Sequence, residues 1–341
     1  MAPVARNPLM KLLLPRHFSG RKLAFLGYFY HSSFPRVARV DIARFQSACG
    51  YAYNQAIGTA KSRLNFQETL QLAQQNILGS VSGLFRYPVK SLRGEALRVT
   101  DVRSSGFAGD RVWAFRDMER NQISTAKRNP LLLQIAARLR DDGHADLTFP
   151  SGEIVRTDMP ECAERVSNFT GRQHALFGLR PATDAAHFAR PPVAKEKFDA
   201  DIREVLGLLA DETLPDFSKF PVEVLMNATV PGTYFDAASI HIVLGSELRR
   251  LQESLPGANA DVMRFRPNIV LNDLDAPLMP DDLIGATVRI GDVVMRLDYP
   301  TPRCAMTTHG QGALPKAPQI MRALVRDWKH NFGLYLSLIH I

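Results

Sequence analysis

The sequence predicts an α+β fold that is rich in β structure, with strands towards both ends and scattered helices between them. The chain has 341 residues and 45% hydrophobic content, enough for two globular domains with cores of their own. Glycine and proline each number 22, a frequency typical of many short strands joined by turns. The clearest hairpin is ATVRIGDVVMRL at 286–297, where apolar and polar residues alternate on both sides of Gly291-Asp292.

The remaining elements follow from periodicity and from turn residues. Short strands are predicted at 81–89, 96–102 and 111–115, and a hairpin at 147–155 around Pro150-Ser151-Gly152. Helical spacing of apolar residues indicates helices at 162–169, 202–209, 246–255 and 319–328. No stretch reaches about 18 uncharged apolar residues, so no membrane span is predicted.

The net charge of +8 belongs to the first 78 residues. This basic leader holds ten Lys/Arg against Asp41 and Glu68, so the remainder of the chain has equal numbers of basic and acidic residues. Such a neutral body lacks the charge excess of a nucleic-acid-binding surface. The leader is either a mitochondrial-type transit segment or a mis-called start with translated upstream sequence, and it is expected to be disordered or inauthentic. Localisation is therefore predicted to be cytoplasmic, or mitochondrial if the transit segment is real.

A polar, proline-containing stretch at 190–197 (RPPVAKEK) is the best candidate for a linker between domains. It divides the ordered part of the chain into an N-terminal domain at 79–193 and a C-terminal domain at 194–341.

The three cysteines, Cys49, Cys162 and Cys304, are far apart and form no CxxC pair. Neither a zinc ribbon nor a cysteine-ligated iron–sulfur cluster is encoded, and an odd, sparse set is not a disulfide framework. Cys304 follows Arg303, and a cationic neighbour favours the thiolate, a soft ligand suited to a heavy metal. The alternative for each cysteine is a small residue of the core.

Three further segments carry polar groups that could bind a ligand. RYPVKS at 86–91 places a cation, a hydroxyl and backbone N–H groups at the end of a strand, a workable anion site. The turn at 106–113 presents Asp110-Arg111, either a surface ion pair or an arginine for a phosphate or pterin carbonyl. In RFRPNIV at 264–270, strand periodicity would place Arg266 and Asn268 on one face, able to read the edge of a heterocycle. For all three segments a purely structural role remains the alternative.

Taken in order, five segments resemble the MOSC superfamily, whose name comes from the C-terminal domain of molybdenum cofactor sulfurases. The resemblance is strongest to two-domain members with an N-terminal MOSC β-barrel, a group that includes the mitochondrial amidoxime-reducing component and bacterial hydroxylaminopurine-resistance proteins. It covers residues 79–335, and the segments are YPVKS (87–91), GDRVW (109–113), STAKRNP (124–130), FRPNIV (265–270) and RCAMTT (303–308).

This resemblance implies a MOSC β-barrel domain and a smaller N-terminal β-barrel-like domain, with a molybdenum–molybdopterin cofactor in the cleft between them. Cys304 matches the catalytic cysteine whose sulfur binds molybdenum, and Arg303 flanks it. The other matched positions are cofactor contacts: Lys90, Ser91 and Arg111 for the pterin and its phosphate, Arg266 and Asn268 for the pterin, and Asp236 and Ser239 in the segment that closes over it.

The implied activity is reduction of N-hydroxylated compounds, such as amidoximes and hydroxylamines, by removal of oxygen at molybdenum. Because no ferredoxin-type cysteine cluster is present, electrons are expected from a separate protein of ferredoxin, flavoprotein or cytochrome type. The alternative is a carrier that binds the cofactor without turnover. A sulfur transferase is less favoured, since residues 1–78 show nothing like a pyridoxal-phosphate domain.

The sequence departs from the family pattern at two places. Thr308 is followed by HGQG (309–312), so contacts to the substrate are expected to differ. The chain ends in LYLSLIHI (334–341), where the pattern leads us to expect another strand and a Gly-Asp turn, and these residues are interpreted as a truncated end or an assembly artefact.

Overall fold

The computed structural model describes residues 10–13, 38–43, 77–216, 226–273 and 279–340, together with Ser218 and Glu223. Strands β1 (Met10–Leu13) and β2 (Ala38–Ala43), with Ile77 and Leu78 at the start of β3, are the described parts of the predicted leader. β1 pairs with β5, and β2 lies between β15 and β3. The other residues of the leader, Cys49 among them, lie outside the described residues, and its interpretation stays a prediction.

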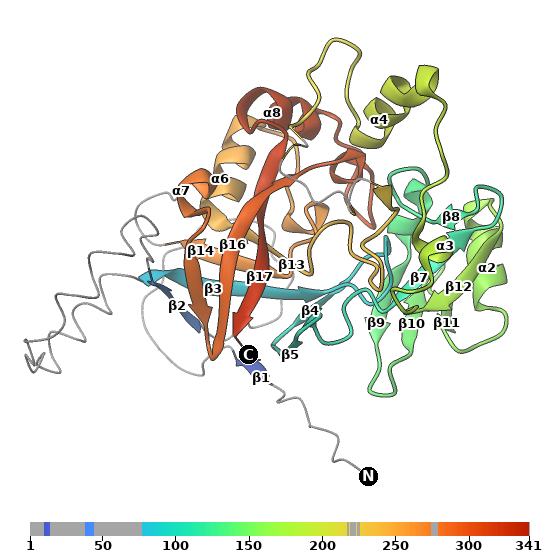
Figure 1. The fold of residues 1–341 in the computed structure, drawn as a ribbon, viewed down its shortest axis with the longest axis horizontal. Coiled ribbons are helices and arrows are strands. Elements are labelled where there is room, and N and C mark those ends of the chain that lie inside the picture. Colours follow the sequence, from blue (N-terminus) through green and yellow to red (C-terminus); the bar gives the residue numbers. More distant parts are fainter. Residues whose placement is uncertain are drawn as a thin grey trace, which may run out of the picture.

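One sheet of eight strands dominates the structure, in the order β14-β13-β17-β16-β15-β2-β3-β4. β14 also pairs with β3, so the sheet curls back on itself (Figure 1). The bounds are β3 (Ile77–Arg86), β4 (Glu95–Leu97), β13 (Ile240–Leu244), β14 (Ile269–Asp273), β15 (Thr287–Ile290), β16 (Val293–Pro302) and β17 (Asn331–His340). The predicted α+β, β-rich fold class is confirmed.

The predicted hairpin at 286–297 forms as β15 and β16, paired antiparallel from Ile290 opposite Val293. Alternate residues of β16, namely Val293, Met295 and Leu297, are buried in the core inside the curled sheet. This period of two is the pattern that predicted the hairpin.

Of the residues interpreted as a truncated end, 334–340 belong to strand β17, which pairs with β13 on one side and β16 on the other. Leu334 and Leu336 of this strand are buried in the same core. The expected strand is therefore present at 331–340.

Three small sheets accompany the large one: the sheet of β1, β5 and β6 lies below it in Figure 1, and the other two lie on the right. Their strands are β5 (Val99–Arg103) and β6 (Gly106–Phe107) with β1; β9 (Ala136–Leu139), β10 (Ala145–Thr148) and β11 (Ile154–Arg156); and β7 (Trp113–Asp117), β8 (Gln122–Ile123) and β12 (His174–Gly178). The predicted hairpin at 147–155 is confirmed by the pairing of β10 with β11. The strand predicted at 96–102 is interrupted by a bend at the exposed Arg98, and the strand predicted from Arg111 begins at Trp113.

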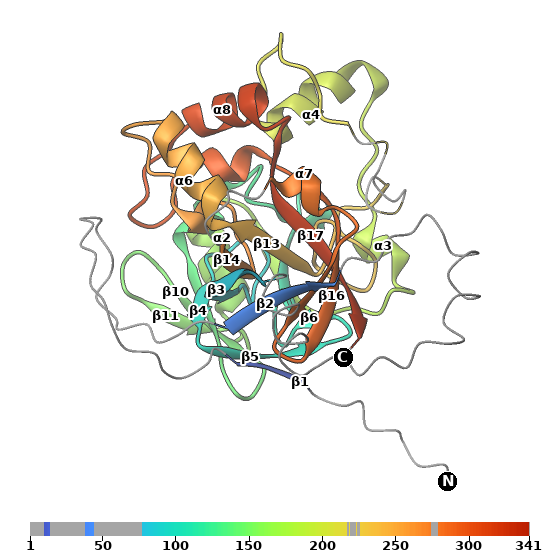
Figure 2. The same cartoon turned by 90° about the vertical axis from the view of Figure 1, so that its left-hand side faces the viewer.

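The four predicted helices are confirmed within a few residues, as α2 (Cys162–Thr170), α4 (Phe198–Leu206), α6 (Gly245–Ser254) and α8 (Gln319–Asp327). Two short helices, α3 (Ala185–Phe188) and α7 (Pro280–Leu283), were not predicted. Figure 2 shows α4, α6 and α8 gathered on one side of the large sheet. Among the described residues, no helix has the length and apolar character needed to span a bilayer.

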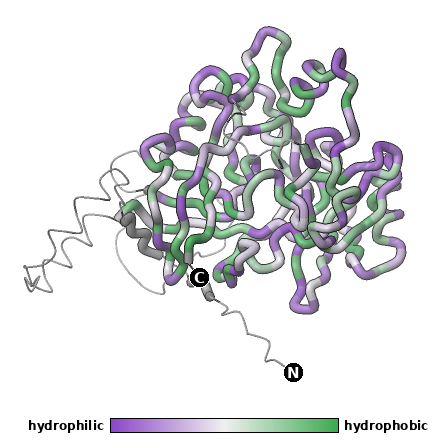
Figure 3. The backbone as a smooth tube through the Cα atoms, in the orientation of Figure 1, coloured by the Kyte–Doolittle hydropathy of each residue, from purple (hydrophilic) through white to green (hydrophobic). Residues whose placement is uncertain are grey.

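Hydrophobic residues run along the strands of the large sheet, while the outer loops are largely hydrophilic (Figure 3). A second core fills the region of the small sheets and contains Phe115, Leu147 and Val166. Met306 of the 3-10 turn η4 (Ala305–Thr308) packs into this second core. The partly buried Cys304, which immediately precedes the turn, packs against the same core. Because this turn follows β16 of the large sheet, it ties the two cores together. The division into domains at residue 193 stays a prediction.

We predict that Gly333→Ala is strongly destabilising. Gly333 has φ +80°, and a Cβ there would lie 2.4 Å from His241 Nε2 and from the Ile242 carbonyl oxygen. The left-handed backbone and the steric overlap together should lower the free energy of unfolding by about 3 kcal/mol, measured by urea denaturation. Gly152→Ala is the matched control: its φ is +87° but its Cβ would meet open space, so about 1 kcal/mol is expected. Equal losses in both variants would contradict the packing argument.

Glu247 predicts a dependence of stability on pH. It is buried in α6, accepts a hydrogen bond from the Gly333 N–H, and burial raises its pKa from 4.5 to about 7. Because the folded state holds this proton more tightly, its contribution to stability is complete below pH 4.5 and is lost as the pH rises through about 7. Relative to Glu247→Gln, the wild type should lose about 2 kcal/mol between pH 5 and 8 in urea denaturation. A constant difference between the two proteins would show that Glu247 titrates normally.

Candidate functional site

A cavity of about 70 Å³ lies where the 3-10 turn η4 joins the two cores, and it gathers nearly all of the predicted site residues. Those that line it are Lys90, Ser91, Arg111, Asp236, Arg266, Asn268, Arg303 and Cys304. Ser239 does not line it and lies against Gly106 instead. The structure therefore brings together eight predicted residues that are spread over more than 200 positions of the chain.

Three of these residues have a left-handed backbone: Ser91 with φ 68°, Arg111 with φ 51° and Arg266 with φ 53°. Such conformations cost a non-glycine residue about 1–3 kcal/mol and cluster at functional sites.

The backbone at Arg266 also corrects the prediction that residues 264–270 form an extended strand. Residues 264–268 are not extended, β14 begins only at Ile269, and Arg266 and Asn268 both reach the cavity through this turn rather than through strand periodicity.

Tyr87 and Asp110 form the buried base of the site. The Tyr87 N–H donates to Asp110 Oδ1 at 2.6 Å, and the Tyr87 hydroxyl donates to the Pro267 carbonyl at 3.1 Å. Asp110 also pairs with the Arg111 guanidinium, and its carboxylate is fully buried, so this is not the surface ion pair considered from the sequence. The Arg266 guanidinium stacks over the Tyr87 ring at 4.2 Å, and that of Arg111 lies at 5.1 Å. Two cations thus stack on one ring.

Asn268 makes its hydrogen bonds within the protein. Its Nδ2 donates to Asp110 Oδ2 at 3.0 Å and to the Phe85 carbonyl at 3.3 Å, while its Oδ1 accepts from the His241 N–H at 3.2 Å. These contacts orient Asp110 and, through it, Arg111. A direct contact of Asn268 with a pterin stays a prediction.

Asp236 is shared between two lysines at the mouth of the cavity. Lys90 Nζ donates to Asp236 and to the Tyr234 carbonyl, the latter at 3.0 Å, and Lys127 Nζ lies 3.0 Å from Asp236 Oδ2. Burial lowers the pKa of Lys90 to about 8, against the opposing effect of Asp236. Burial raises the pKa of Asp236, but Lys127 and Lys90 outweigh this and hold it well below its usual range.

Lys127 connects this ion pair to Cys304. Burial lowers the pKa of Lys127, but the negative charge of Asp236 outweighs it, so that the pKa is raised overall. Lys127 therefore stays protonated at neutral pH, beside the thiol.

Cys304 is partly exposed and faces the cavity, whereas Cys162 is buried in α2, where burial raises the pKa of its thiol to about 12. Of the two described cysteines, only Cys304 is therefore accessible as a metal ligand.

Arg303, the neighbour of Cys304, donates from Nη2 to the Phe265 carbonyl at 2.7 Å. Its buried Nε has no hydrogen-bond partner among the described residues. Such an unsatisfied donor is expected where a ligand binds.

The charges around the cavity do not balance. Four cations line it, Lys90, Arg111, Arg266 and Arg303, against Asp236 at its mouth and Asp110 beneath it. Burial lowers the pKa of Arg266 to about 10, assisted by Arg111, so that it remains cationic at neutral pH. The excess positive charge favours an anionic ligand, and the guanidinium groups suit phosphate.

Within the described part of the chain, no three His, Cys, Asp or Glu side chains gather to hold a metal ion. A metal beside Cys304 would therefore need further ligands from a bound organic group. A soft thiolate next to a cation-rich cavity fits an anionic cofactor that carries its own metal. The fold and the site define a β-rich protein with a cation-lined cavity beside an accessible thiol.

Two family models match the chain, in the order the sequence predicted. The MOSC N-terminal beta barrel domain matches residues 78–189, and the MOSC domain matches residues 231–340. The chain is a MOSC-domain protein.

Molybdenum cofactor sulfurases of fruit flies are among its relatives. The protein of Drosophila grimshawi is 23% identical over 295 residues, which make up 79% of this chain and 33% of that protein. The protein of Drosophila mojavensis is 33% identical over 104 residues, which make up 29% of this chain and 13% of that protein. The chain thus spans a third or less of the relatives it matches. Domains and relatives together support a function connected with the molybdenum cofactor.

Several site residues were not singled out from the sequence: Tyr87, Lys127, His241 and Tyr335. The first two lie inside segments that carried the family resemblance, so their position was a usable signal. His241 and Tyr335 line the cavity from β13 and β17. Burial lowers the pKa of His241 far below its usual range, so its ring is neutral. In the sequence these two residues look like ordinary strand positions.

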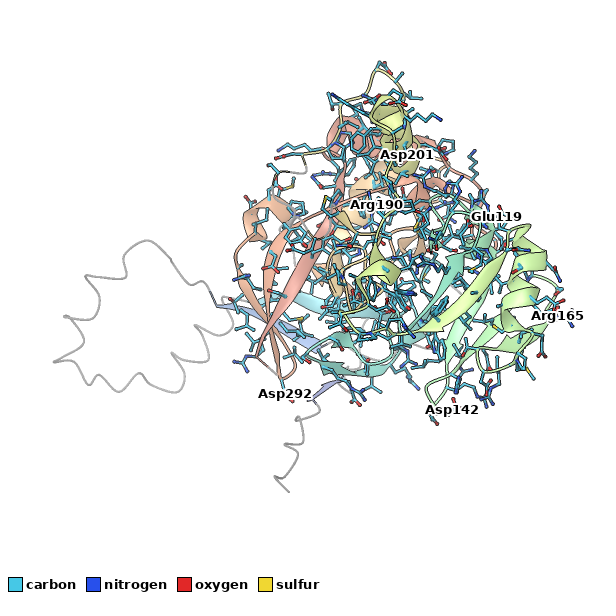
Figure 4. All side chains as sticks on the ribbon, turned by 45° about the vertical axis from the view of Figure 1, so that its right-hand side comes forward. Glu119, Asp142, Arg165, Arg190, Asp201 and Asp292 are labelled. Atoms are coloured by element: carbon cyan, nitrogen blue, oxygen red, sulfur yellow. The ribbon has the colours of Figure 1, made fainter. Side chains whose placement is uncertain are left out.

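We predict that Asp110→Asn destabilises the folded protein by about 3 kcal/mol in urea denaturation, because it removes the counter-charge of the buried Arg111. It also replaces an acceptor of the Tyr87 and Asn268 hydrogen bonds. Asp292→Asn, at the exposed turn labelled in Figure 4, is the matched control and should be nearly neutral. A loss below about 1 kcal/mol at Asp110 would contradict its role as the base of the site.

Proposed function

We propose that this chain binds the molybdenum cofactor in the cavity around Cys304 and reduces N-hydroxylated compounds. The observation that carries the proposal is the position of the accessible Cys304 thiol at the edge of a cavity with excess positive charge and an unsatisfied Arg303 Nε. In this proposal Cys304 Sγ is the protein ligand of molybdenum. Lys90, Ser91, Arg111, Arg266 and Arg303 hold the anionic and pterin parts of the cofactor.

The bound cofactor would supply two-electron redox chemistry at molybdenum. The overall reaction converts an amidoxime to an amidine, or a hydroxylamine to an amine. It consumes two electrons and two protons, and the oxygen of the N-hydroxy group is released as water. A separate protein supplies the electrons. Lys127, protonated and next to Cys304, is the side chain best placed to hold a proton near the departing oxygen.

A carrier of the cofactor is the second candidate, and it uses the same cavity and the same thiol. The sulfurase relatives do not separate the two functions, since they match over a third or less of their length. The difference lies in turnover, because a carrier binds the cofactor without reducing a substrate.

The test is reduction of benzamidoxime with chemically reduced methyl viologen, with benzamidine quantified by liquid chromatography. We expect turnover in the wild type and its loss in Cys304→Ala, because the variant lacks the metal ligand. Cys162→Ala, which alters a buried residue of α2 that does not line the cavity, should retain turnover. A wild-type protein that contains molybdenum but produces no benzamidine would contradict the reductase and favour the carrier.

A further inference from the structure

A second cavity of about 290 Å³ adjoins the site and is larger than the first. It lies between α4 and the strand β8, with the segment 190–193 on one side. Its volume is close to the lower end of the range for small-molecule pockets. The MOSC resemblance assigned no role to its lining residues.

Two contacts link this cavity to Cys304. Lys127 lines it, and the Lys127 ammonium pairs with Asp236, which lines the first cavity. Helix α4 forms one wall of the cavity and is capped at its C-terminus by Gly207. A Cβ on Gly207 would lie 3.2 Å from the Cα of Ala305, the residue that follows Cys304. The second cavity therefore adjoins the cavity that Cys304 lines.

One wall is apolar. Phe198, Ile202 and Val205 recur at helical spacing along α4 and all line the cavity. Phe198 is 54% exposed, a large fraction for an aromatic residue in a folded protein. This wall provides an apolar surface for the body of a ligand.

The opposite side carries unbalanced positive charge. Arg120, Lys127, Arg128 and Arg190 line the cavity against a single carboxylate, Asp201. Asp201 accepts from Arg128 at 2.5 Å and Lys127 pairs with Asp236, so neither carboxylate neutralises Arg120 or Arg190. Arg190 donates to the neutral Asn227 carbonyl at 3.0 Å, and among the described residues neither Arg190 nor Arg120 has a carboxylate within ion-pairing distance. Figure 4 shows Arg190 and Asp201 near each other, at the junction of α4 and the small sheets.

We propose that this second cavity binds the substrate, and that it selects N-hydroxylated compounds with an apolar or aromatic body and a carboxylate or phosphate group. The body lies on the α4 wall and the anion meets Arg120 and Arg190. The N-hydroxy group then points past Lys127 towards Cys304. This inference rests on the proposed reductase function and narrows its substrate class.

The test is isothermal titration calorimetry of the purified full-length protein with 4-carboxybenzamidoxime and with benzamidoxime. The two probes differ only in the carboxylate. We expect the carboxylate compound to bind roughly tenfold more tightly at low salt, and the ratio to fall as salt screens the charges. In the double variant Arg120→Gln/Arg190→Gln the ratio should approach one. Arg165→Gln, on α2 at the right-hand edge of Figure 4, is the matched control and should preserve the ratio.

Equal affinities of the two probes in the wild type would overturn the inference. A tenfold preference that survives in the double variant but is lost in Lys90→Gln would also overturn it, because the anion would then bind in the first cavity. Because binding is measured without electron donor, a failure of turnover leaves this result intact. Conversely, equal affinities would leave the proposed reductase function standing.

Discussion

The buried carboxylate of Asp110 joins three segments that are far apart in the chain. It accepts the Tyr87 N–H after β3, pairs with Arg111 before β7, and accepts from Asn268 before β14. Asp110 thereby holds the Tyr87 backbone in place, and with it the ring on which the Arg111 and Arg266 guanidinium groups stack. Through Asn268 it also holds the turn from which Arg266 enters the cavity. The rest of the site depends on this interaction, because without Asp110 the Arg111 guanidinium would lack its counter-charge.

The arrangement leaves more positive charge around the cavity than the protein neutralises. Asp110 is committed to Arg111 and Asp236 to Lys90 and Lys127, while Arg266 and Arg303 donate to backbone carbonyls. The left-handed backbones at Ser91, Arg111 and Arg266 store strain at the same place. Uncompensated charge and strain cost stability, and both are explained if the cavity exists to bind an anionic ligand. The second cavity continues the positive charge outward through Lys127.

Local patterns predicted most of the fold. The β15–β16 hairpin, the β10–β11 hairpin and the helices α2, α6 and α8 follow from periodicity and turn residues within a few positions. The topology did not follow from local patterns, since the pairing of β3 with β14 and the central place of β17 depend on contacts between residues far apart in sequence.

The site residues were predicted from motif segments, which are local. Their roles were harder to predict, because Asn268 supports Asp110 and Lys127 bridges two cavities only through tertiary contacts. His241 and Tyr335 left no sequence signal.

The central claim is that Cys304 and the surrounding cations bind the molybdenum cofactor. It is tested most directly by the molybdenum content, determined by mass spectrometry, of the full chain and of Cys304→Ala, both produced in a host that makes the cofactor. Near-stoichiometric molybdenum in the wild type and its loss from a folded Cys304→Ala variant is the predicted result. Folded wild-type protein without molybdenum, or a variant that retains it, would contradict the account.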